Sequence, residues 1–234
     1  YSRVGRKKMK IFILAGEASG DAIGARIIRA LRTHSQGEFE FCGVGGSEMQ
    51  AAGMRSSLFD MRDLSLMGVS EVIPALPRII KRLKQALRAV LDEKPDIVVT
   101  IDAPDFAFRL QSAIKKRMGA EERPFQVHCV APTVWAWRPG RAEKVAKFLD
   151  LLLCLYPFEP DYFNAHGLKA EFIGHTAMEK DSPAQADIDA LRHRLGIKEN
   201  TQAIGLFPGS REAEIGRTGP QLADGIKLYC DQHT

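Results

Sequence analysis

Two kinds of segment alternate along most of this chain. Short apolar runs such as residues 97–101 predict buried strands, and apolar residues three or four positions apart, such as Ile23, Ile27 and Leu31, predict amphipathic helices. On this basis we expect strands at residues 10–15, 39–44, 97–101, 125–130, 151–155 and 171–173, and helices at 21–32, 47–52, 69–93, 106–118, 141–149 and 160–165. The alternation predicts an α/β fold, a doubly wound parallel sheet with helices on both faces.

The pattern changes after residue 176 and indicates a second unit. The polar residues 177–200, with a Ser182-Pro183 pair, are typical of a linker, and residues 203–207 predict a strand that is followed by a helical tail. One strand and one helix cannot bury a core, so we expect the chain to be cut off inside a second Rossmann-like domain. We expect the apolar side chains of this unit, such as Ile204, Leu206 and Leu228, to be exposed or to be covered by the first domain or another copy. The predicted division is a leader or disordered segment at 1–8, a domain at 9–176, a linker at 177–200 and a truncated domain at 201–234.

The composition is that of a globular protein with a mild positive charge. Of the 234 residues, 45% are hydrophobic, and 33 Lys and Arg against 29 Asp and Glu give a net charge of +4. This charge does not favour a nucleic-acid binder, because it concentrates in one helix without interleaved aromatic residues. No run approaches the roughly 18 apolar residues of a membrane-spanning helix, and no signal peptide is visible.

The first residues and the cysteines bear on the natural start of the chain and on its cellular compartment. Residues 2–8 are polar and basic and the first strand follows Met9, so we expect Met9 to be the natural start; a basic arm that contacts anionic surfaces is the alternative. The four cysteines are Cys42, Cys129, Cys154 and Cys230, and their spacing is not that of metal ligands. No two histidines have such a spacing either. A reduced cytoplasmic compartment and no metal are therefore predicted.

The end of the strand at 97–101 is the first candidate for chemistry. It runs directly into Asp102 and Asp105, which flank Ala103-Pro104. Ligands of open α/β sheets bind beyond the carboxyl ends of the strands. A carboxylate there takes a proton from an alcohol if burial raises its pKa toward neutrality. We assign this general-base role to Asp102, and we expect Asp105 to cap a helix that begins at residue 106.

A glycine-containing loop follows the first strand and reads Gly16-Glu17-Ala18-Ser19-Gly20-Asp21. Gly16 and Gly20 permit a tight turn and the close approach of a ligand. The carboxylates of Glu17 and Asp21 would repel a phosphate and suit sugar hydroxyls better. In the alternative interpretation, Ser19 or Asp21 only caps the helix that follows.

A second loop holds both tryptophans, Trp135 and Trp137, beside Arg138 and Arg141. Aromatic faces next to arginine commonly receive sugars, bases or acyl chains, which we favour here over simple core packing. His175 ends the last predicted strand, where it either contacts substrate or serves as a hinge residue.

Two further segments suggest anion and membrane binding. After residue 207, Gly209 and Ser210 offer backbone N–H groups and Arg211 a planar guanidinium to an anion, unless Arg211 is only a solvated turn residue. Residues 77–90 form a basic amphipathic pattern, preceded by Met67-Gly68. Such a helix either lies on an anionic membrane surface or covers the sheet with its apolar stripe.

Taken together, these motifs resemble those of the lipid-A-disaccharide synthase family, inverting glycosyltransferases of the GT-B architecture. The matching segments run in family order from about residue 9 to Arg211: residues 16–21, 63–64, 67–68, 71–72, 101–106, 132–138, 157–159, 172–176 and 208–211. Because many short motifs agree, no single one has to carry the assignment.

The resemblance implies a reaction and a place for it. The family transfers 2,3-diacylglucosamine from UDP-2,3-diacylglucosamine to the 6-hydroxyl of 2,3-diacylglucosamine 1-phosphate, without a metal or cofactor. It is cytoplasmic and peripheral on the inner membrane of Gram-negative bacteria, which favours the membrane interpretation of the basic helix. In this chain the resemblance implies an acceptor-binding domain at 9–176, the start of a nucleotide-sugar domain at 201–234, and Asp102 as catalytic base. Substrate contacts would come from Gly16, Glu17, Ser19, Gly20, Asp21, Met67, Trp135, Trp137, Arg138 and His175, and nucleotide contacts from Gly209, Ser210 and Arg211.

Members of that family extend well beyond 234 residues, so we expect this chain alone to be inactive in transfer. One alternative is a fragment that retains only lipid or acceptor binding. Another is a different UDP-sugar enzyme of the GT-B architecture, such as an epimerase. Whether the protein forms a homo-oligomer stays open.

Overall fold

The computed structural model describes residues 8–35, 37–64, 69–175, 178, 183–198, 201–209 and 212–233; at 69–75, 137, 212–213 and 233 it describes the backbone only. The chain divides into two compact units, Tyr1–Glu179 and Lys180–Thr234, and each is treated by itself.

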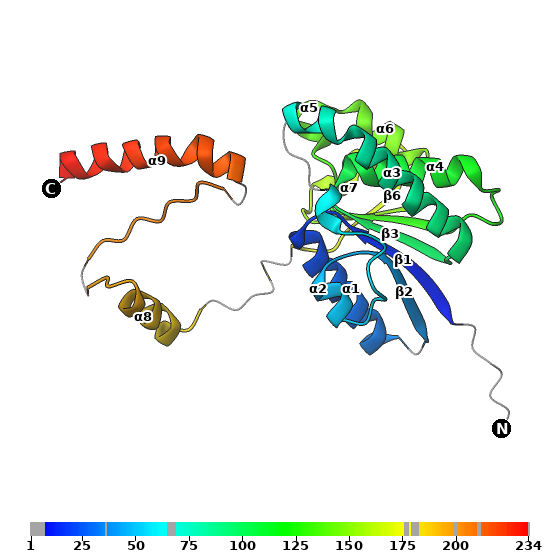
Figure 1. Cartoon of the computed structure of the whole chain (residues 1–234), viewed down its shortest axis with the longest axis horizontal. Coiled ribbons are helices and arrows are strands. Elements are labelled where there is room, and N and C mark those ends of the chain that lie inside the picture. The colour runs from blue at the N-terminus through cyan, green and yellow to red at the C-terminus, as the bar shows by residue number, and fades with distance from the viewer. Residues whose placement is uncertain are drawn as a thin grey trace, which may run out of the picture. The chain divides into compact units, whose positions relative to one another are not determined.

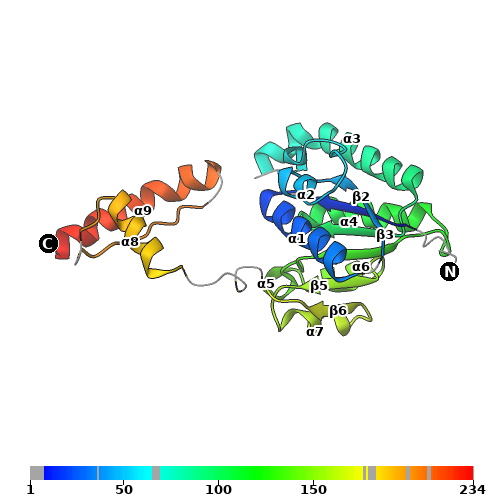
Figure 2. The same cartoon turned by 90° about the horizontal axis from the view of Figure 1, so that it is seen from below.

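The first unit is built on a six-stranded parallel sheet (Figures 1 and 2). Its strands are β1 (Met9–Ala15), β2 (Phe39–Val44), β3 (Ile97–Ile101), β4 (Phe125–Cys129), β5 (Leu151–Cys154) and β6 (Lys169–Phe172), in the order β2-β1-β3-β4-β5-β6. From β1 the chain goes to β2 on one side and later to β3 on the other, so the order reverses between β1 and β3. That reversal is a topological switch point, where open α/β sheets bind their ligands.

Helices cover both faces of this sheet, as the fold prediction requires. They are α1 (Ala18–His34), α2 (Ser47–Ala51), the 3-10 helix η1 (Met61–Leu64), α3 (Val69–Glu93), α4 (Pro104–Arg117), α5 (Val134–Trp137), α6 (Gly140–Ala146) and α7 (Glu159–Asn164). Alternate side chains of β1 enter opposite cores: Ile11 and Ile13 pack with α1 and α2, whereas Phe12 and Leu14 pack with α3 and α4. Figure 1 shows these helix pairs on opposite sides of the sheet. The doubly wound α/β prediction is confirmed.

Several element boundaries differ from the sequence prediction, among them those of β6, which spans Lys169–Phe172 and not 171–173, and of α1, which spans Ala18–His34 and not 21–32. The helix expected from residue 106 begins at Pro104, because proline at a first helical position loses no hydrogen bond. The loop expected to hold the tryptophans contains a single helical turn, α5.

The second unit contains α8 (Gln185–Arg194) and α9 (Glu212–His233). The strand expected at residues 203–207 is absent from the described part of the chain. A strand needs a neighbour for its backbone hydrogen bonds, and all six described strands pair within the sheet of the first unit. Within this unit, Ile204, Leu206 and Leu228 expose 46%, 46% and 63% of their accessible area.

A buried polar pair lies in the middle of the sheet. The Thr100 hydroxyl and His128 Nδ1 share a hydrogen bond of 2.7 Å between adjacent strands, and both residues are fully buried. Phe108 packs edge-on against the imidazole, with ring centroids 4.6 Å apart. Burial, aided by the positive charge of Arg141, lowers the pKa of His128 to about 3.

We expect this histidine to make the fold sensitive to mild acid. The folded protein keeps His128 neutral. Its contribution to the free energy of unfolding is therefore complete above pH about 6.5 and declines as the pH falls toward the pKa in the folded state. Between pH 6.5 and 5 the loss in free energy of unfolding is about 2 kcal/mol. Urea unfolding of the wild type and of His128→Gln at both pH values measures it. Equal losses in the two proteins would contradict the assignment.

Candidate functional site

The carboxyl ends of β1 and β3 meet at the switch point and bring two predicted site residues together. Ala15 is in register with Ile101, so Gly16 and Asp102 each follow directly on a paired strand end. A Cβ added at Gly16 would lie 2.5 Å from the Cβ of Ala103 and 3.6 Å from that of Leu64. Only glycine therefore allows the first loop to pack this closely against the turn that carries Asp102.

That turn has a strained backbone. Asp102 and Ala103 are consecutive residues in the left-handed region, with φ of 53° and 45°, and Val130 at the end of the neighbouring β4 has φ of 78°. Each such residue costs about 1–3 kcal/mol, and they cluster where function requires a fixed geometry. The Asp102 amide donates to the Cys129 carbonyl at 3.0 Å, which ties the turn to β4. The Asp102 side chain is half-buried, so it is not sealed inside the sheet.

The glycine-containing loop is divided between exposed and structural residues. Ser19 is exposed, and Glu17 is half-buried at the N-cap of α1, where its side chain makes no capping bond. Gly20 packs against the end of β3, since an added Cβ would lie 3.4 Å from the Ile101 carbonyl oxygen.

Asp21 does not fit the predicted substrate-binding role. It is only 3% exposed, and its carboxylate accepts backbone N–H bonds from Gly46 at 2.8 Å, Glu48 at 3.0 Å and Met49 at 3.1 Å. The carboxylate therefore binds the backbone amides at the start of α2. It does not cap α1, so the alternative prediction of a cap by Asp21 is wrong.

Asp105 also differs from the prediction. It lies in the first turn of α4 and makes no capping bond. Its carboxylate instead accepts a bond of 2.7 Å from the Arg141 guanidinium, across to α6. The cap prediction is wrong because the helix begins one residue before Asp105, at Pro104.

The tryptophan segment belongs to a larger aromatic group at the ends of β4 and β5. Trp135 packs edge-on to Phe158, with centroids 4.9 Å apart, and 6.1 Å from Tyr162. The Tyr156 ring stacks on that of Phe158, with centroids 5.9 Å apart, and its centroid is also 5.9 Å from that of the half-buried His175 ring. Phe158, Tyr162 and Tyr156 are each about half exposed. Sequence reasoning did not single out these three residues, although the 157–159 segment was among the family motifs.

A buried carboxylate fixes the turn between Tyr156 and Phe158. Glu159 is 2% exposed, and its carboxylate accepts the amides of Leu155 at 2.9 Å and Tyr156 at 3.0 Å. Burial raises the pKa of this carboxyl, against the effect of those two amide bonds.

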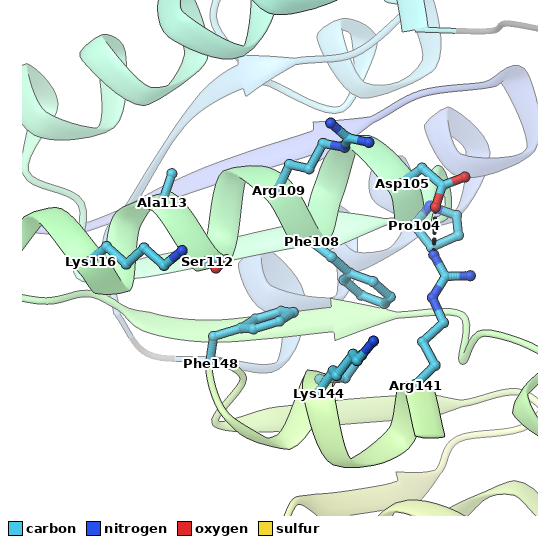
Figure 3. Close-up of a pocket in the computed structure, with 11 residues that line it drawn as sticks. Pro104, Asp105, Phe108, Arg109, Ser112, Ala113, Lys116, Arg141, Lys144 and Phe148 are labelled. Atoms are coloured by element: carbon cyan, nitrogen blue, oxygen red, sulfur yellow. Dashed lines mark hydrogen bonds and ion pairs between the residues drawn. The ribbon is translucent and has the colours of Figure 1, made fainter. Parts of the chain in front are cut away.

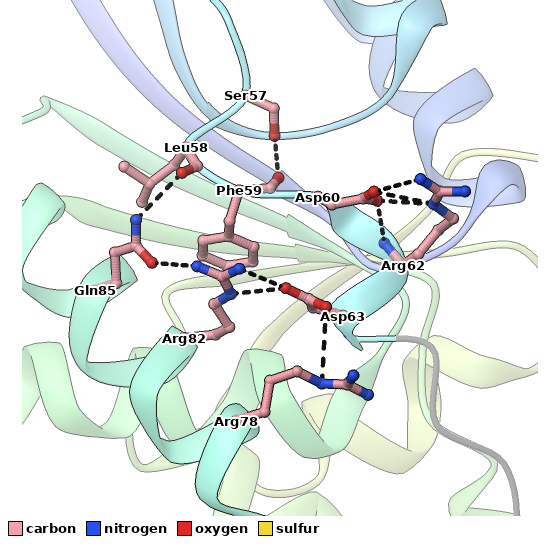
Figure 4. Close-up of polar contacts among 9 residues, drawn as sticks. All are labelled: Ser57, Leu58, Phe59, Asp60, Arg62, Asp63, Arg78, Arg82 and Gln85. Atoms are coloured by element: carbon pink, nitrogen blue, oxygen red, sulfur yellow. Dashed lines mark hydrogen bonds and ion pairs between the residues drawn. The ribbon is translucent and has the colours of Figure 1, made fainter. Parts of the chain in front are cut away.

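Arginines of α3 hold η1 in place (Figure 4). Arg82 donates to the Asp63 carboxylate at 2.7 Å and stacks over the Phe59 ring at 4.9 Å, while Arg78 approaches the same carboxylate at 3.7 Å. Through Leu64, η1 then packs beside Gly16. Part of the basic face of α3 is thus used inside the domain.

Several predicted residues cannot be joined to this site. Met67, Ser210 and Arg211 lie outside the described residues. Trp137 is the last residue of α5, and Arg138 follows it with an exposed side chain. Gly209, with φ of 115°, belongs to the second unit. Among the described residues, no group of three or more His, Cys, Asp or Glu side chains is placed to hold a metal ion.

Comparison with known proteins places this chain in a family. A family model described as lipid-A-disaccharide synthetase matches residues 11–233. The chain belongs to the lipid-A-disaccharide synthetase family. A lipid-A-disaccharide synthase of Rhodospirillum centenum is 47% identical over 227 residues, which cover 97% of this chain and 55% of that protein. One of Ruegeria pomeroyi is 41% identical over 231 residues, which cover 99% of this chain and 56% of that protein. The chain therefore spans about half the length of these relatives.

The fold of this family member also occurs in a solved structure. The UDP-GlcNAc 2-epimerase of Neisseria meningitidis, solved with UDP-GlcNAc, matches with a TM-score of 0.53 and 12% identity, over 83% of this chain and 55% of the epimerase chain. At this identity the likeness concerns the fold alone.

Proposed function

We propose that this chain is the acceptor-binding part of a lipid-A-disaccharide synthase. The observation that carries the proposal is Asp102, a half-buried carboxylate on a strained turn at the switch point of the sheet. Gly16 packs against that turn, where only a residue without a side chain fits, and so helps to fix the position of the carboxylate. Family membership supports lipid A precursors as the substrate class, and the proposed substrates are the two acylated glucosamines that the resemblance implies, one attached to UDP and one carrying a 1-phosphate.

In the proposed reaction Asp102 takes the proton of the acceptor 6-hydroxyl. The oxygen then attacks the anomeric carbon of the donor from the face opposite UDP, a new C–O bond forms, and the bond to the diphosphate breaks. UDP leaves with the electron pair, and the configuration inverts. Gly209, Ser210 and Arg211 are proposed to stabilise the charge that develops on the diphosphate. The aromatic group around Trp135 and Phe158 is proposed to receive the sugar or its acyl chains.

A chimera tests this proposal. It continues residues 1–234 with the part of the Rhodospirillum centenum relative that lies beyond the match. We expect the chimera to form the β-1,6 disaccharide and UDP from the two acylated substrates, and the isolated chain to form neither. An epimerised UDP-sugar as the only product would favour the epimerase alternative. Normal turnover by the isolated chain would contradict the division of the site between two domains.

We also propose that α3 brings the protein to the surface of the inner membrane. Its inner stripe, including Ala86 and Val90, packs on the sheet, but Leu76 and Ile80 remain 43% and 44% exposed next to exposed lysines. Exposed apolar residues among cations suit an anionic lipid surface. No helix in the described part of the chain has the length and hydropathy to cross a membrane.

The double variant Leu76→Ser/Ile80→Ser tests the membrane proposal. We expect it to weaken binding to vesicles of anionic phospholipid, measured by cosedimentation, about thirtyfold or more, because each of the two side chains that insert into the lipid surface contributes about 1 kcal/mol or more. A Leu191→Ser/Leu195→Ser variant, which changes exposed leucines near the end of α8, is the matched control. Equal loss in both variants would contradict a specific role of α3.

A further inference from the structure

An open cavity of about 440 Å³ lies between α4 and α6, and we call it the α4–α6 groove (Figure 3). It begins at Pro104 and Asp105, directly after the turn that carries Asp102, and extends along α4 as far as Lys116. The proposed transfer reaction assigns nothing to it.

The groove carries a strong positive charge. Four cations line it, Arg109 and Lys116 from α4 and Arg141 and Lys144 from α6, against the single carboxylate of Asp105. Only Arg141 is paired, with Asp105; within the described part of the chain Arg109, Lys116 and Lys144 form no ion pair. The side chains that line the cavity thus carry a net charge of three positive units, four cations against one carboxylate, which favours an anionic ligand.

The floor between these cations is apolar and aromatic. The rings of Phe108 and Phe148 are neighbours, with centroids 5.7 Å apart and planes tilted by 55°, and the Arg141 guanidinium lies 5.3 Å from the centroid of the Phe108 ring. Figure 3 shows both rings between the two helices, with Lys116 and Lys144 reaching from opposite walls. A small inorganic anion would leave this floor in water, whereas a ligand with an apolar part would cover it.

The lining also discriminates between classes of apolar anion. A nucleotide base needs several hydrogen-bond donors and acceptors at its edge, and Ser112 is the only neutral polar side chain that lines the groove. The first residue of α4 is Pro104, which has no N–H group to offer a diphosphate. An acyl chain needs no such partners.

We propose that the α4–α6 groove binds one phosphorylated lipid, its phosphate between Lys116 and Lys144 and the first carbons of its acyl chain on Phe108 and Phe148. Such a ligand comes from either of two sources, a phospholipid of the membrane or the phosphorylated acceptor of the proposed reaction. The acceptor as source rests on the proposed function, whereas a phospholipid as source does not, and binding of either to this chain is measured without donor and without turnover.

Calorimetric titration of the 234-residue chain tests the proposal. The probe is dihexanoyl phosphatidic acid at concentrations where it is monomeric, so that adsorption to a lipid surface through α3 plays no part. Dihexanoyl phosphatidylcholine and inorganic phosphate are titrated in parallel. We expect phosphatidic acid to bind at least about tenfold more tightly than either, since only it offers both the anionic phosphate and the apolar chain.

Two variants separate the cations from the floor. Lys116→Glu/Lys144→Glu is expected to weaken phosphatidic acid binding about tenfold or more, because two attractive charges become repulsive. Lys115→Glu/Lys198→Glu changes the net charge equally at exposed lysines outside the groove and is expected to bind as the wild type does. Phe148→Ala is expected to weaken binding of phosphatidic acid and to leave that of inorganic phosphate unchanged. Thermal unfolding checks that each variant is folded.

The outcomes decide both the site and the source. Binding of phosphatidic acid and inorganic phosphate with the same measurable affinity would overturn the lipid assignment, and equal weakening by the two lysine pairs would overturn the location. A titration with 2,3-diacylglucosamine 1-phosphate assigns the source. Binding of this sugar lipid alone, lost in Lys116→Glu/Lys144→Glu, identifies the groove as part of the acceptor site, and binding of both lipids identifies a site for phospholipid as well. Binding of neither lipid would overturn the proposal.

Discussion

Replacing Asp102 with asparagine is expected to lower the turnover number of the chimera by about 10²–10⁴-fold, the contribution of a general base. The amide keeps the size of the side chain but cannot take a proton from the acceptor hydroxyl. Asparagine also tolerates the left-handed backbone that this position requires, with φ of 53°, so the turn should keep its shape. Acceptor binding, measured by calorimetry, should therefore change by less than about threefold.

The kinetic pattern distinguishes a proton-transfer role from a structural one. Loss of an interaction made only in the transition state lowers kcat and leaves the KM for the acceptor nearly unchanged, whereas a distorted site raises KM. Asp92→Asn is the matched control, because this exposed carboxylate lies near the end of α3 and outside the proposed site. Turnover by Asp102→Asn within a few-fold of the wild type would show that another group takes the proton.

The sheet and the position of Asp102 could be predicted because both follow from local patterns. A run such as residues 97–101 indicates a buried strand by its composition alone. Parallel strands end at one edge, so the residue after a strand end is placed without knowledge of distant contacts. The same reasoning placed Gly16, although the contact with Ala103 that requires a glycine there is visible only in the structure.

The errors concern carboxylates whose partners are distant in sequence. Asp21 binds amides of Gly46, Glu48 and Met49, and Asp105 binds Arg141, so no local pattern separates these two from a substrate-binding carboxylate. The strand expected at residues 203–207 fails for a related reason. Its apolar composition is suited to a strand, but a strand also needs a neighbour, and composition does not report whether one is present.

Replacing Gly16 with alanine is expected to damage the site without unfolding the domain. The new Cβ would come within 2.5 Å of the Ala103 Cβ, which is closer than two carbon atoms can approach, so the turn must shift. Overpacking of this kind lowers the free energy of unfolding by about 1–3 kcal/mol. Displacement of a catalytic group by about 1 Å lowers activity about a hundredfold, so we expect a loss of that order in the kcat/KM of the chimera.

A second substitution tests whether the contact itself is responsible. Ala103→Gly removes the Cβ that the new methyl group meets and suits the left-handed backbone at that position, where φ is 45°. The double variant Gly16→Ala/Ala103→Gly should therefore recover most of the lost kcat/KM and stability. Gly119→Ala is the control for adding a methyl group, since nothing lies within 4 Å of a Cβ there. If the double variant is no more active than Gly16→Ala, the loss does not arise from crowding against the turn, and Gly16 instead leaves space for the substrate itself.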